Sequence, residues 1–600
     1  MKSLGGYMGR ILRVDLSNRT LTDEELGEEL LSRFMGGAAL GAKILYEETP
    51  EGIDALHPDN PMIFGTGPVT GTAVPGTGGW NLVCKGPLVS GFSVSSQAQG
   101  HFGARLKFAG YDDIVVKGAS DKWCYLFIHD GKAEIKDASH LVGKDAFETN
   151  DLLKSELNLP KASVVSIGPA GENMIDIACV QGDRGHNIGN GGAGAVMGSK
   201  KLKAIVVSGT NKVPIHNPEK FSELVKEWAQ TLMTLPTGAA VNAGGTLAWQ
   251  EGIYKQGWLP VKNLTTNIFP EWANFTGEAL RSDKSIERKR DTCHSCVLNH
   301  CSQLKIVDGP HAGWEGEEPE YEPTAQFSAN IGGTHLHDAI VLADLNDRMG
   351  MNVNGAGFAI ALAMECYEKG IITQKDTDGL ELTWGNVDAV RQLLPKMANR
   401  EGFGAVLCDG PMKAAQRIGG DAEKFAVYLG KGNPPHGHDP RGLWPILFTQ
   451  VVTNNSSAQG GSLNPVFDPK KVAKYEKGGV VFCHTTDSAV LCNFVSTGPP
   501  HLASAINFAT GWELTAQEVM LHGERAVNLL RLFNIREGVT PEHETASPRL
   551  LESSPDGPNE GKTIEPHLKE MRADYHRYMG WDEVTGKPLP ETLEGLGIKE

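Results

Sequence analysis

The sequence predicts an α+β protein in which a β-rich N-terminal domain precedes two mostly α-helical domains. Short apolar runs of strand length dominate the first third of the chain, and apolar residues at helical spacing dominate the rest. The 600 residues also exceed the length of ~250–300 at which a single hydrophobic core stops growing. We therefore expect three domains, at residues 1–213, 214–420 and 421–600.

The expectation of strands rests on alternation and on short apolar runs. Leu12, Val14 and Leu16 alternate with polar residues, which is the period of a half-buried strand. Asp130 and Gly131 separate two alternating stretches, which is a signal for a β-hairpin. Further apolar runs occur at residues 62–64, 114–116, 164–165 and 205–207. We expect residues 1–210 to consist of strands joined by glycine-rich turns.

Helical signals begin shortly after residue 213. The Asn-Pro pair at residues 217–218 is a helix start, with Asn as the N-cap. Residues 357–369 are apolar on nearly all sides and stop at a glycine, which predicts a buried helix. Residues 515–518 form a capping box that opens a helix through residue 533. The last 50 residues are polar and contain several prolines, so we expect them to wrap over the surface.

Composition excludes several classes of function. The chain has 56 Lys and Arg against 73 Asp and Glu, a formal net charge of −17. Such a surface repels phosphate backbones and anionic lipids, so we expect neither nucleic acid nor a membrane as partner. No apolar run reaches the ~18 residues of a membrane span, and no secretory signal is visible, which predicts a cytoplasmic protein. Ten cysteines in this setting favour a metal site over disulfides.

The cysteines are densest in one nine-residue run, at Cys293, Cys296 and Cys301. Three thiolates at this C-x2-C-x4-C spacing can bind one inorganic centre, and thiolates suit zinc or an iron–sulfur cluster. A structural zinc site could be completed by His294 or His300. A cluster often takes its fourth ligand from far along the chain, and Cys492 is a candidate. The spacing alone leaves both kinds of centre open.

Glycine makes up 72 of the 600 residues, against a usual share of ~7%. Two glycine-rich blocks lie at residues 65–103 and 182–198. The second contains a formal G-x-G-x-x-G, but the next predicted strand begins near residue 202, which leaves no room for the full helix of a dinucleotide-binding unit. Tight turns explain each block alone. Two such blocks in one β domain favour a backbone cradle around a large anionic ligand.

Two motifs place an aspartate near the end of a predicted helix. In the first, Asp347 precedes Gly350 and Asn352, and in the second, Asp487 begins the sequence that ends at Cys492. Asp and Asn side chains at such positions could hydrogen-bond a heterocycle. A helix C-cap followed by a turn explains the first motif alone, but the related shape of the two favours a shared role in binding.

Three side chains are candidates for proton transfer. Glu322 ends an acidic stretch and leads into apolar sequence, so it could point inward, where desolvation would raise the pKa of its carboxyl group. His436 and His438 lie in a loop rich in proline and glycine and could act as acid or base. The ordinary alternative is that the acidic stretch is solvated and that the loop merely displays its histidines.

Taken together, these segments resemble the aldehyde:ferredoxin oxidoreductase family of tungsten or molybdenum bis-pterin enzymes. The similarity runs nearly from end to end. Its most specific stretches are residues 101–112 (HFGARLKFAGYD), 167–173 (IGPAGEN), 194–200 (GAVMGSK) and 487–492 (DSAVLC). The resemblance implies a β-rich base for the cofactor, with two helical domains over it.

The resemblance also implies the cofactors and the residues that bind them. Two pterin dithiolenes would hold the metal, a [4Fe–4S] cluster would lie beside one pterin, and Mg²⁺ would lie between the pterin phosphates. The cluster ligands would be Cys293, Cys296, Cys301 and Cys492. One pterin would be bound by Asp347, Gly350 and Asn352, and the other by Asp487 and Leu491. Glu322 matches the active-site glutamate of the family.

Several positions around the expected cofactor depart from the family pattern. Trp80 stands in place of an arginine that would bridge cluster and pterin, and Gln97 replaces an asparagine that helps to hold Mg²⁺. His186 and Asn190 stand where arginines would meet the pterin phosphates. Three neighbours that we also expect at the cofactor site are Asn81, Asn187 and Gly189.

Other departures lie in the motifs themselves. Asn352 replaces an aspartate, Val490 replaces a glycine, and one residue is inserted before Cys301. The catalytic histidine of the family is absent, because Gly460 aligns with it. Glu322 is therefore the one acid–base residue that matches.

The resemblance implies an oligomeric enzyme that interconverts an aldehyde and a carboxylic acid and passes electrons to ferredoxin or an iron–sulfur subunit. The missing histidine leaves other small substrates of the family open, namely 2-oxo acids and aromatic acyl thioesters. A rival of a different class is a non-catalytic scaffold with structural zinc at the cysteine run. Metal analysis would separate the two classes.

Overall fold

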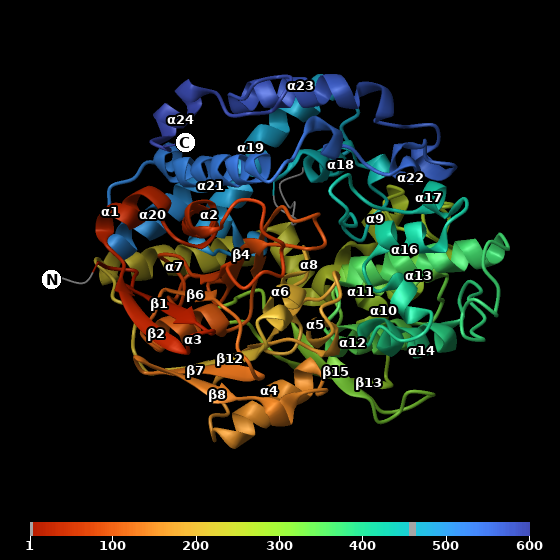
Figure 1. Cartoon of the computed structure of the whole chain (residues 1–600), viewed down its shortest axis with the longest axis horizontal. Coiled ribbons are helices and arrows are strands. Elements are labelled where there is room, and N and C mark those ends of the chain that lie inside the picture. Colours follow the sequence, from red (N-terminus) through yellow and green to blue (C-terminus); the bar gives the residue numbers. More distant parts are fainter. Residues whose placement is uncertain (1–3, 455–463, 600) are drawn as a thin grey trace.

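The computed structural model describes residues 4–454 and 464–599 (Figure 1). Two six-stranded sheets form its N-terminal part. The first sheet contains, in spatial order, β2 (Thr20–Glu25), β1 (Arg10–Asp15), β6 (Asp113–Lys117), β3 (Met62–Gly65), β4 (Trp80–Lys85) and β5 (Ser93–Ala98). The second contains β11 (His186–Ile188), β10 (Val180–Gly182), β9 (Ser163–Ser166), β12 (Leu202–Ser208), β7 (Cys124–His129) and β8 (Lys132–Asp137). Most neighbours are antiparallel, but β1 with β6 and β7 with β12 are parallel.

The two sheets pack face to face, and helices cover their outer faces. On β12, Ile205 faces the core between the sheets while Val206 faces outward onto α4 (Ala146–Glu156). On β6, Ile114 faces the same inner core while Val115 packs under α2 (Gly37–Glu48) and α21 (Ala516–Arg536). Figure 1 shows this order of layers. Strands covered on both faces read as continuous apolar runs, as in residues 114–116 and 205–207.

The predicted strands and hairpin are confirmed, but the N-terminal part is not made of strands alone. β7 and β8 pair in antiparallel register across Asp130 and Gly131, both of which have positive φ. Helices that the sequence analysis did not predict interrupt the strands. They are α1 (Glu28–Phe34), α2, α3 (Phe102–Phe108), α4, α5 (Pro169–Glu172) and α6 (Ala193–Ser199).

The remainder of the chain is mostly helical, as predicted. Its helices are α7 (Pro218–Thr234), α8 (Pro236–Gly244), α9 (Gln250–Lys255), α10 (Gly277–Ser282), α11 (Tyr321–Gln326), α12 (Leu336–Met349), α13 (Val353–Glu368), α14 (Val387–Ala398), α15 (Gly404–Leu407), α16 (Pro411–Ile418), α17 (Ala422–Phe425), α18 (Trp444–Val452), α19 (Pro469–Ala489), α20 (Pro499–Thr510), α21, α22 (Pro548–Leu551), α23 (Leu568–Met579) and α24 (Pro590–Leu596). Across the described ranges, no helix combines the length and apolar character needed to span a membrane.

A small third sheet stands within this helical part and was not predicted. Its strands are β13 (Ile286–Arg290), β14 (Ser302–Ile306) and β15 (Glu315–Glu317), paired in that order. The loop between β13 and β14 carries the dense cysteine run. Strand pairing therefore fixes both ends of that loop, and the backbone N–H of Asp291 donates to the carbonyl of Cys301 across it, at 2.9 Å.

The predicted helix starts are confirmed by their caps. The side chain of Asn217 accepts a hydrogen bond from the Lys220 backbone at the start of α7. Thr515 and Glu518 form both halves of the capping box of α21. The buried helix predicted over 357–369 is α13, and Gly370 follows it with φ +70°.

The prediction of a surface wrap for the last 50 residues is wrong. Helix α23 inserts Met571 and Tyr575 into a core shared with α18 and α19, and Trp581 follows them. Apolar residues spaced along one face of a short helix are enough to dock it, even in a polar sequence. The polar composition of this segment led to the expectation of a surface wrap, although the spacing of its apolar residues indicates a docked helix.

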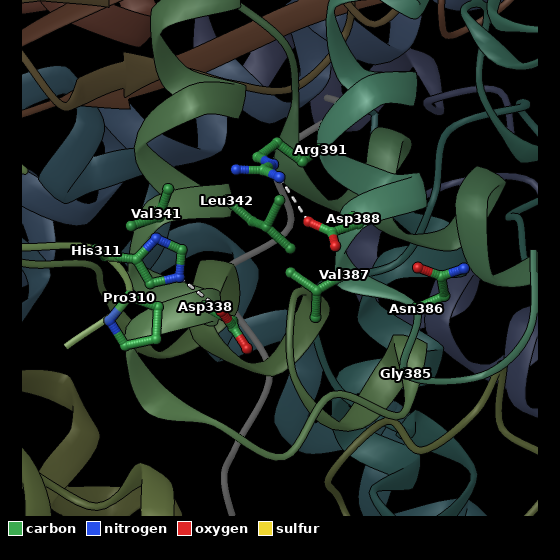
Figure 2. Close-up of a pocket in the computed structure, with 10 residues that line it drawn as sticks. All are labelled: Pro310, His311, Asp338, Val341, Leu342, Gly385, Asn386, Val387, Asp388 and Arg391. Carbon is green, nitrogen blue, oxygen red and sulfur yellow. Dashed lines mark hydrogen bonds and ion pairs between the residues drawn. The ribbon is translucent and has the colours of Figure 1, made fainter. Parts of the chain in front are cut away.

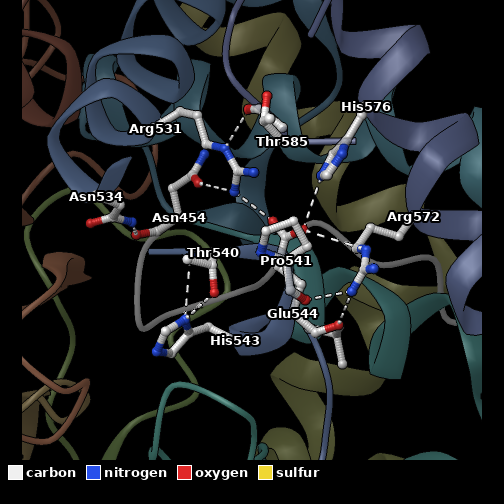
Figure 3. Close-up of polar contacts among 12 residues, drawn as sticks. Asn454, Arg531, Asn534, Thr540, Pro541, His543, Glu544, Arg572, His576 and Thr585 are labelled. Atoms are coloured by element: carbon white, nitrogen blue, oxygen red, sulfur yellow. Dashed lines mark hydrogen bonds and ion pairs between the residues drawn. The ribbon is translucent and has the colours of Figure 1, made fainter. Parts of the chain in front are cut away.

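A buried ion network holds α23 against α21 (Figure 3). Glu544 accepts hydrogen bonds from Arg531 of α21 and from Nε2 of His576 of α23, the latter at 3.0 Å. Burial favours the protonated carboxyl group, but Arg531 and His576 overcome it and lower the pKa of Glu544 to about 2. Arg531 also donates to Asn454, whose backbone carbonyl accepts from Ser93 of β5. The network thus connects both helices to the first sheet.

Replacement of Met571 by alanine tests whether helix α23 is part of the core. Met571 is fully buried, so Met571→Ala should cost about 2–5 kcal/mol of stability through lost burial and a cavity. Calorimetry should show a lower melting temperature. The neighbouring Glu570 is exposed, so Glu570→Ala should change stability by less than about 0.5 kcal/mol. Equal melting temperatures for the two variants would contradict the packing described here.

Candidate cofactor and active site

The structure brings the four predicted cluster ligands into one region. The Sγ atoms of Cys293 and Cys301 lie within 4.8 Å of each other. Cys492 follows α19 and donates its backbone N–H to Gly76 at 3.2 Å. Burial raises the pKa of the Cys492 thiol, and the nearby Cys296 and Cys293 raise it further. In the part of the chain that the structure describes, no two cysteines form a disulfide. These sulfur atoms fit the thiolate donor set of an iron–sulfur cluster or a zinc ion.

Two imidazoles contact these cysteines. Nε2 of His186, in β11, lies 3.7 Å from Sγ of Cys293. Nε2 of His300 lies 3.6 Å from Sγ of Cys301 and 3.1 Å from a carboxylate oxygen of Glu320. His186 was expected at the pterin phosphates, and its contact with Cys293 was not predicted. His300, one of the two candidates to complete a zinc site, lies next to a cysteine.

The other zinc candidate lies apart from the sulfur atoms. Nε2 of His294 is 3.1 Å from the backbone carbonyl of Thr72, and its ring meets Phe108 edge-on at a centroid distance of 5.8 Å. The imidazole of His294 is thus held by the N-terminal domain. Within the described residues, no hydrogen bond links it to a cysteine.

The first aspartate motif is held by a close backbone approach. Helix α12 ends at Gly350, whose φ is +77°, and a Cβ there would lie 2.9 Å from the backbone nitrogen of Gly168. Any other residue would be strained and would push the two loops apart. Just before this turn, Asp347 accepts a hydrogen bond from Asn187 at 3.2 Å. Burial, and then the neighbouring Asp344, raise the pKa of Asp347 to about 7.

Asn352 binds the protein itself. Its Oδ1 accepts from the Gly355 backbone as the N-cap of α13, and its Nδ2 donates to the carbonyl of Gly189, both at 2.6 Å. An aspartate could supply the cap but not the donor. The replacement of aspartate by asparagine therefore has a physical reason, since it joins α13 to the second glycine-rich block.

The second aspartate motif lies in the last turn of α19. Burial alone raises the pKa of Asp487 to about 7. The amide nitrogen of Gln97 donates to the carbonyl of Leu491 at 3.0 Å, which joins this motif to β5. Val490 has φ +54°, a left-handed conformation that is unusual for a β-branched residue. The glycine of the family pattern would adopt it without strain.

Buried polar atoms without partners lie between these motifs. Within the described residues no hydrogen bond reaches the following atoms: Trp80 Nε1, Asn81 Oδ1 and Nδ2, Gln97 Oε1, Gln181 Oε1, Asn187 Oδ1 and Asn190 Oδ1. The pairs of β4 with β5 and of β10 with β11 carry five of these six residues, and the sheets meet where Trp80 Nε1 faces Gly182. Since buried polar atoms nearly always have partners, this set fits a large polar ligand.

The indole ring of Trp80 packs into the core between the two sheets, apart from its unpartnered N–H. Its ring stacks on Phe64 at 5.7 Å and tilts against Phe102 at 5.2 Å, inside the core between the sheets. The indole therefore replaces an arginine by apolar packing, and only its N–H remains to meet a ligand. Gln97 keeps a free carbonyl oxygen, the type of ligand that Mg²⁺ prefers.

The three acid–base candidates are brought together. Glu322, in the first turn of α11, accepts from Asn354 at 3.0 Å and lies 3.9 Å from Nδ1 of His436. A Cβ on Gly437 would lie 3.1 Å from Glu322, so the loop packs directly on α11. The side chain of Glu322 is 34% exposed, which is less desolvated than the sequence analysis expected.

His438 lies beside Tyr321, with 4.9 Å between ring centroids. Burial lowers the pKa of His438 to about 4, so the imidazole is neutral at pH 7. In the part of the chain that the structure describes, neither His438 Nδ1 nor the Tyr321 hydroxyl has a hydrogen-bond partner. Tyr321, which directly precedes Glu322, was not among the predicted site residues. The position of Gly460, aligned with the family histidine, lies outside the described residues.

Two protein-family models together match nearly the whole chain. The model described as "Aldehyde ferredoxin oxidoreductase, N-terminal domain" matches residues 11–209, and that described as "Aldehyde ferredoxin oxidoreductase, domains 2 & 3" matches residues 223–598. The chain belongs to the aldehyde ferredoxin oxidoreductase family. It is an oxidoreductase.

Relatives within the aldehyde ferredoxin oxidoreductase family match from end to end. The chain is 36% identical to the tungsten-containing aldehyde ferredoxin oxidoreductase of Pyrococcus furiosus, over 99% of each chain. It is 34% identical to the protein of that name from Thermococcus kodakarensis, again over 99% of each. A P. furiosus protein named "Aliphatic sulfonate oxidoreductase, WOR-like subunit" is 31% identical over 99% of this chain and 97% of its own length.

A solved structure shares the family fold. A chain in the active-site complex BamBC of benzoyl coenzyme A reductase, solved with 1,5-dienoyl-CoA, superposes with a TM-score of 0.87 at 24% identity. The match covers 99% of this chain and 98% of that chain. The two sheets with their helical remainder are thus a known architecture, and the predicted fold class is confirmed.

A surface pocket lies away from the residues described above (Figure 2). Its volume is about 510 Å³, and it lies between α12 and α14. Its polar side chains already have partners, since His311 pairs with Asp338 at 2.7 Å and Arg391 with Asp388 at 2.5 Å. No residue proposed for the cofactor lines it. We therefore place the candidate site of this family member between the sheets and α12 and α19.

The burial of Asp487 predicts a pH dependence of stability in the cofactor-free protein. With its pKa raised to about 7, the folded state keeps a proton that the unfolded state releases, so stability falls as pH rises from about 4 to 7. Asp487→Asn removes this cost. The stability of the variant relative to wild type should grow by about 3 kcal/mol between pH 5 and pH 8.

Calorimetry of both proteins across this pH range measures the difference. Glu570→Asn serves as the control, because Glu570 is exposed, and its difference from wild type should not vary with pH. A constant difference for Asp487→Asn would mean that the carboxylate is not desolvated as described.

Proposed function

We propose that this protein is a tungsten- or molybdenum-dependent bis-pterin oxidoreductase that interconverts an aldehyde and a carboxylic acid, with a [4Fe–4S] cluster. One observation carries the proposal: four neighbouring cysteines and the two aspartates Asp347 and Asp487 accompany a set of buried polar atoms that have no partner in the described residues. The names of the family relatives support tungsten.

The residues of this chain would bind the cofactor as follows. Cys293, Cys296, Cys301 and Cys492 would hold the cluster. Asp347 and Asp487 would each accept hydrogen bonds from a pterin, with Asn81, Asn187, Gly189 and Asn190 around the phosphates and Gln97 beside Mg²⁺. When bound, the metal–pterin group would supply two-electron redox chemistry, and the cluster one-electron transfer.

Oxidation of an aldehyde to the acid consumes one water and releases two electrons and two protons. Glu322 is placed to accept a proton, because its carboxylate is half-buried and has one protein hydrogen-bond donor, Asn354. His436, 3.9 Å away, would pass that proton on. Neutral His438 and Tyr321 would orient the substrate oxygen through their unpartnered polar atoms.

Electrons would leave through the cluster to ferredoxin or an iron–sulfur subunit. Cys296 and Cys492 are half-buried, whereas Cys293 and Cys301 are buried. Electrons would therefore leave the cluster on the side of Cys296 and Cys492. Electron transfer falls off with distance, so a partner would dock on that side. The lack of disulfides among the described residues agrees with the reducing cytoplasm that we propose as location. We also propose an oligomer.

Other substrates of the same chemistry follow from the relatives. A 31% identical relative is named for aliphatic sulfonates, and the 24% identical structure belongs to a benzoyl-coenzyme A reductase. Together with 2-oxo acids, these classes define a screen with a viologen dye as electron acceptor or donor. We expect the highest kcat/KM with an aldehyde.

Metal and pterin content of the anaerobically purified protein tests the proposal. We expect about four iron atoms and one tungsten or molybdenum per chain, together with pterin fluorescence after oxidation. The scaffold alternative predicts one zinc and no pterin. That second result would overturn the proposed function.

Substitution of Glu322 tests its part in proton transfer. Glu322→Gln should lower kcat by about 10²–10⁴-fold with little change in KM, because the amide keeps the contact but cannot accept a proton. Glu251→Gln is the matched control, since Glu251 is exposed and pairs with the exposed Lys255. Steady-state kinetics with unchanged metal content would measure both. An equal kcat for the two variants would exclude Glu322 as the proton acceptor.

A further inference from the structure

Two imidazoles occupy equivalent places beside the cysteines, although they come from different parts of the chain. His186 belongs to the second sheet, where β10 and β11 pair with His186 opposite Gly182. His300 belongs to the cysteine run itself. Each directs Nε2 at a sulfur atom, His186 at Cys293 (3.7 Å) and His300 at Cys301 (3.6 Å).

Each imidazole is positioned by its surroundings. The glycine turn before His186 leaves space for the carboxyl group of Glu317, because a Cβ on Gly185 would overlap it. His300 is oriented by Glu320, which accepts from the same Nε2 at 3.1 Å and also from the hydroxyl of Thr246. The ring of Phe494 packs edge-on against His300, with 5.9 Å between centroids.

A hydrogen bond to a thiolate ligand withdraws negative charge from the cluster. The reduced cluster carries one more electron, so it gains more from such a bond than the oxidised cluster does. Hydrogen bonds to the sulfur atoms are among the factors that set the reduction potential of an iron–sulfur cluster. A donor beside a ligating cysteine therefore raises the midpoint potential.

We propose that His186 and His300 are positioning residues that donate hydrogen bonds from Nε2 to the Cys293 and Cys301 thiolates and raise the reduction potential of the cluster. The inference rests on the proposed function, because it requires the cluster. His186 has the larger effect, since within the described residues its Nε2 contacts Cys293 alone, whereas the N–H of His300 is shared between Cys301 and Glu320.

The experiment is a redox titration of the anaerobic holoenzyme at one fixed pH, followed by the electron paramagnetic resonance signal of the reduced cluster. The variants are His186→Phe and His300→Phe, which keep a ring but lose the donor, and His186→Gln, which restores an N–H. His294→Phe is the matched control, because His294 lies in the same run and contacts the Thr72 carbonyl instead of a cysteine.

We expect His186→Phe to make reduction of the cluster at least about tenfold less favourable, which is about 59 mV for one electron. His300→Phe should shift the potential in the same direction by less, and His186→Gln should recover part of the loss. His294→Phe should keep the wild-type potential. Iron content should stay at the wild-type value in all four.

Two results would overturn the inference. The first is a potential for His186→Phe and His300→Phe equal to that of His294→Phe. The second is loss of iron from both His186→Phe and His186→Gln, which would make His186 a ligand instead of a hydrogen-bond donor. Absence of a cluster from the wild-type protein would instead overturn the proposed function, so the two failures are distinguishable.

Discussion

Desolvation of two carboxyl groups, those of the half-buried Asp347 and the buried Asp487, is the main electrostatic constraint on the centre of this molecule. Each lies in the last turn of a long helix, where the partial negative charge of the helix end adds to the cost of desolvating an anion. Within the described residues, Asp487 gains little from its neighbours, and burial is the sole cause of its raised pKa. The arrangement is stable with a proton on each carboxyl group, or with N–H donors supplied from outside the chain.

Glycine allows the ends of these helices to reach the sheets. A Cβ on Gly350 would lie 2.9 Å from the backbone nitrogen of Gly168, and a Cβ on Gly76 would lie 3.0 Å from the Cβ of Cys492. The first approach joins α12 to the second sheet, and the second joins the region after α19 to the first sheet. Glycine at these two positions lets the end of α12 and the segment after α19 approach the sheets closely. Larger residues there would separate the two aspartates.

Local patterns predicted most of the fold. Alternation located the strands, and caps located α7 and α21, because these signals depend on neighbouring residues. Helix α2 escaped notice since its sequence, GAALGAKILYEE, is buried on nearly all sides and has little amphipathic character. Helix α23 was expected at the surface because its composition is polar. Its residues Met571 and Tyr575, followed by Trp581, nevertheless pack into the core.

The site was predictable to the extent that it resembles a family. The resemblance assigned the four cysteines and both aspartates, and the structure brings the cysteines into one region. It could not foresee that His186 contacts Cys293, because this depends on how the second sheet meets a loop more than one hundred residues later. Nor could it explain Asn352, whose side-chain amide donates to the carbonyl of Gly189, likewise distant in sequence.

The first turn of α11 has a consequence for the communication between the two halves of the site. Glu320, its N-cap, turns toward His300, while Glu322, two positions later, turns toward His436. Side chains two apart at a helix start diverge, yet their backbones move as one rigid unit. A shift of this turn would therefore displace the partner of His300 and the partner of His436 together.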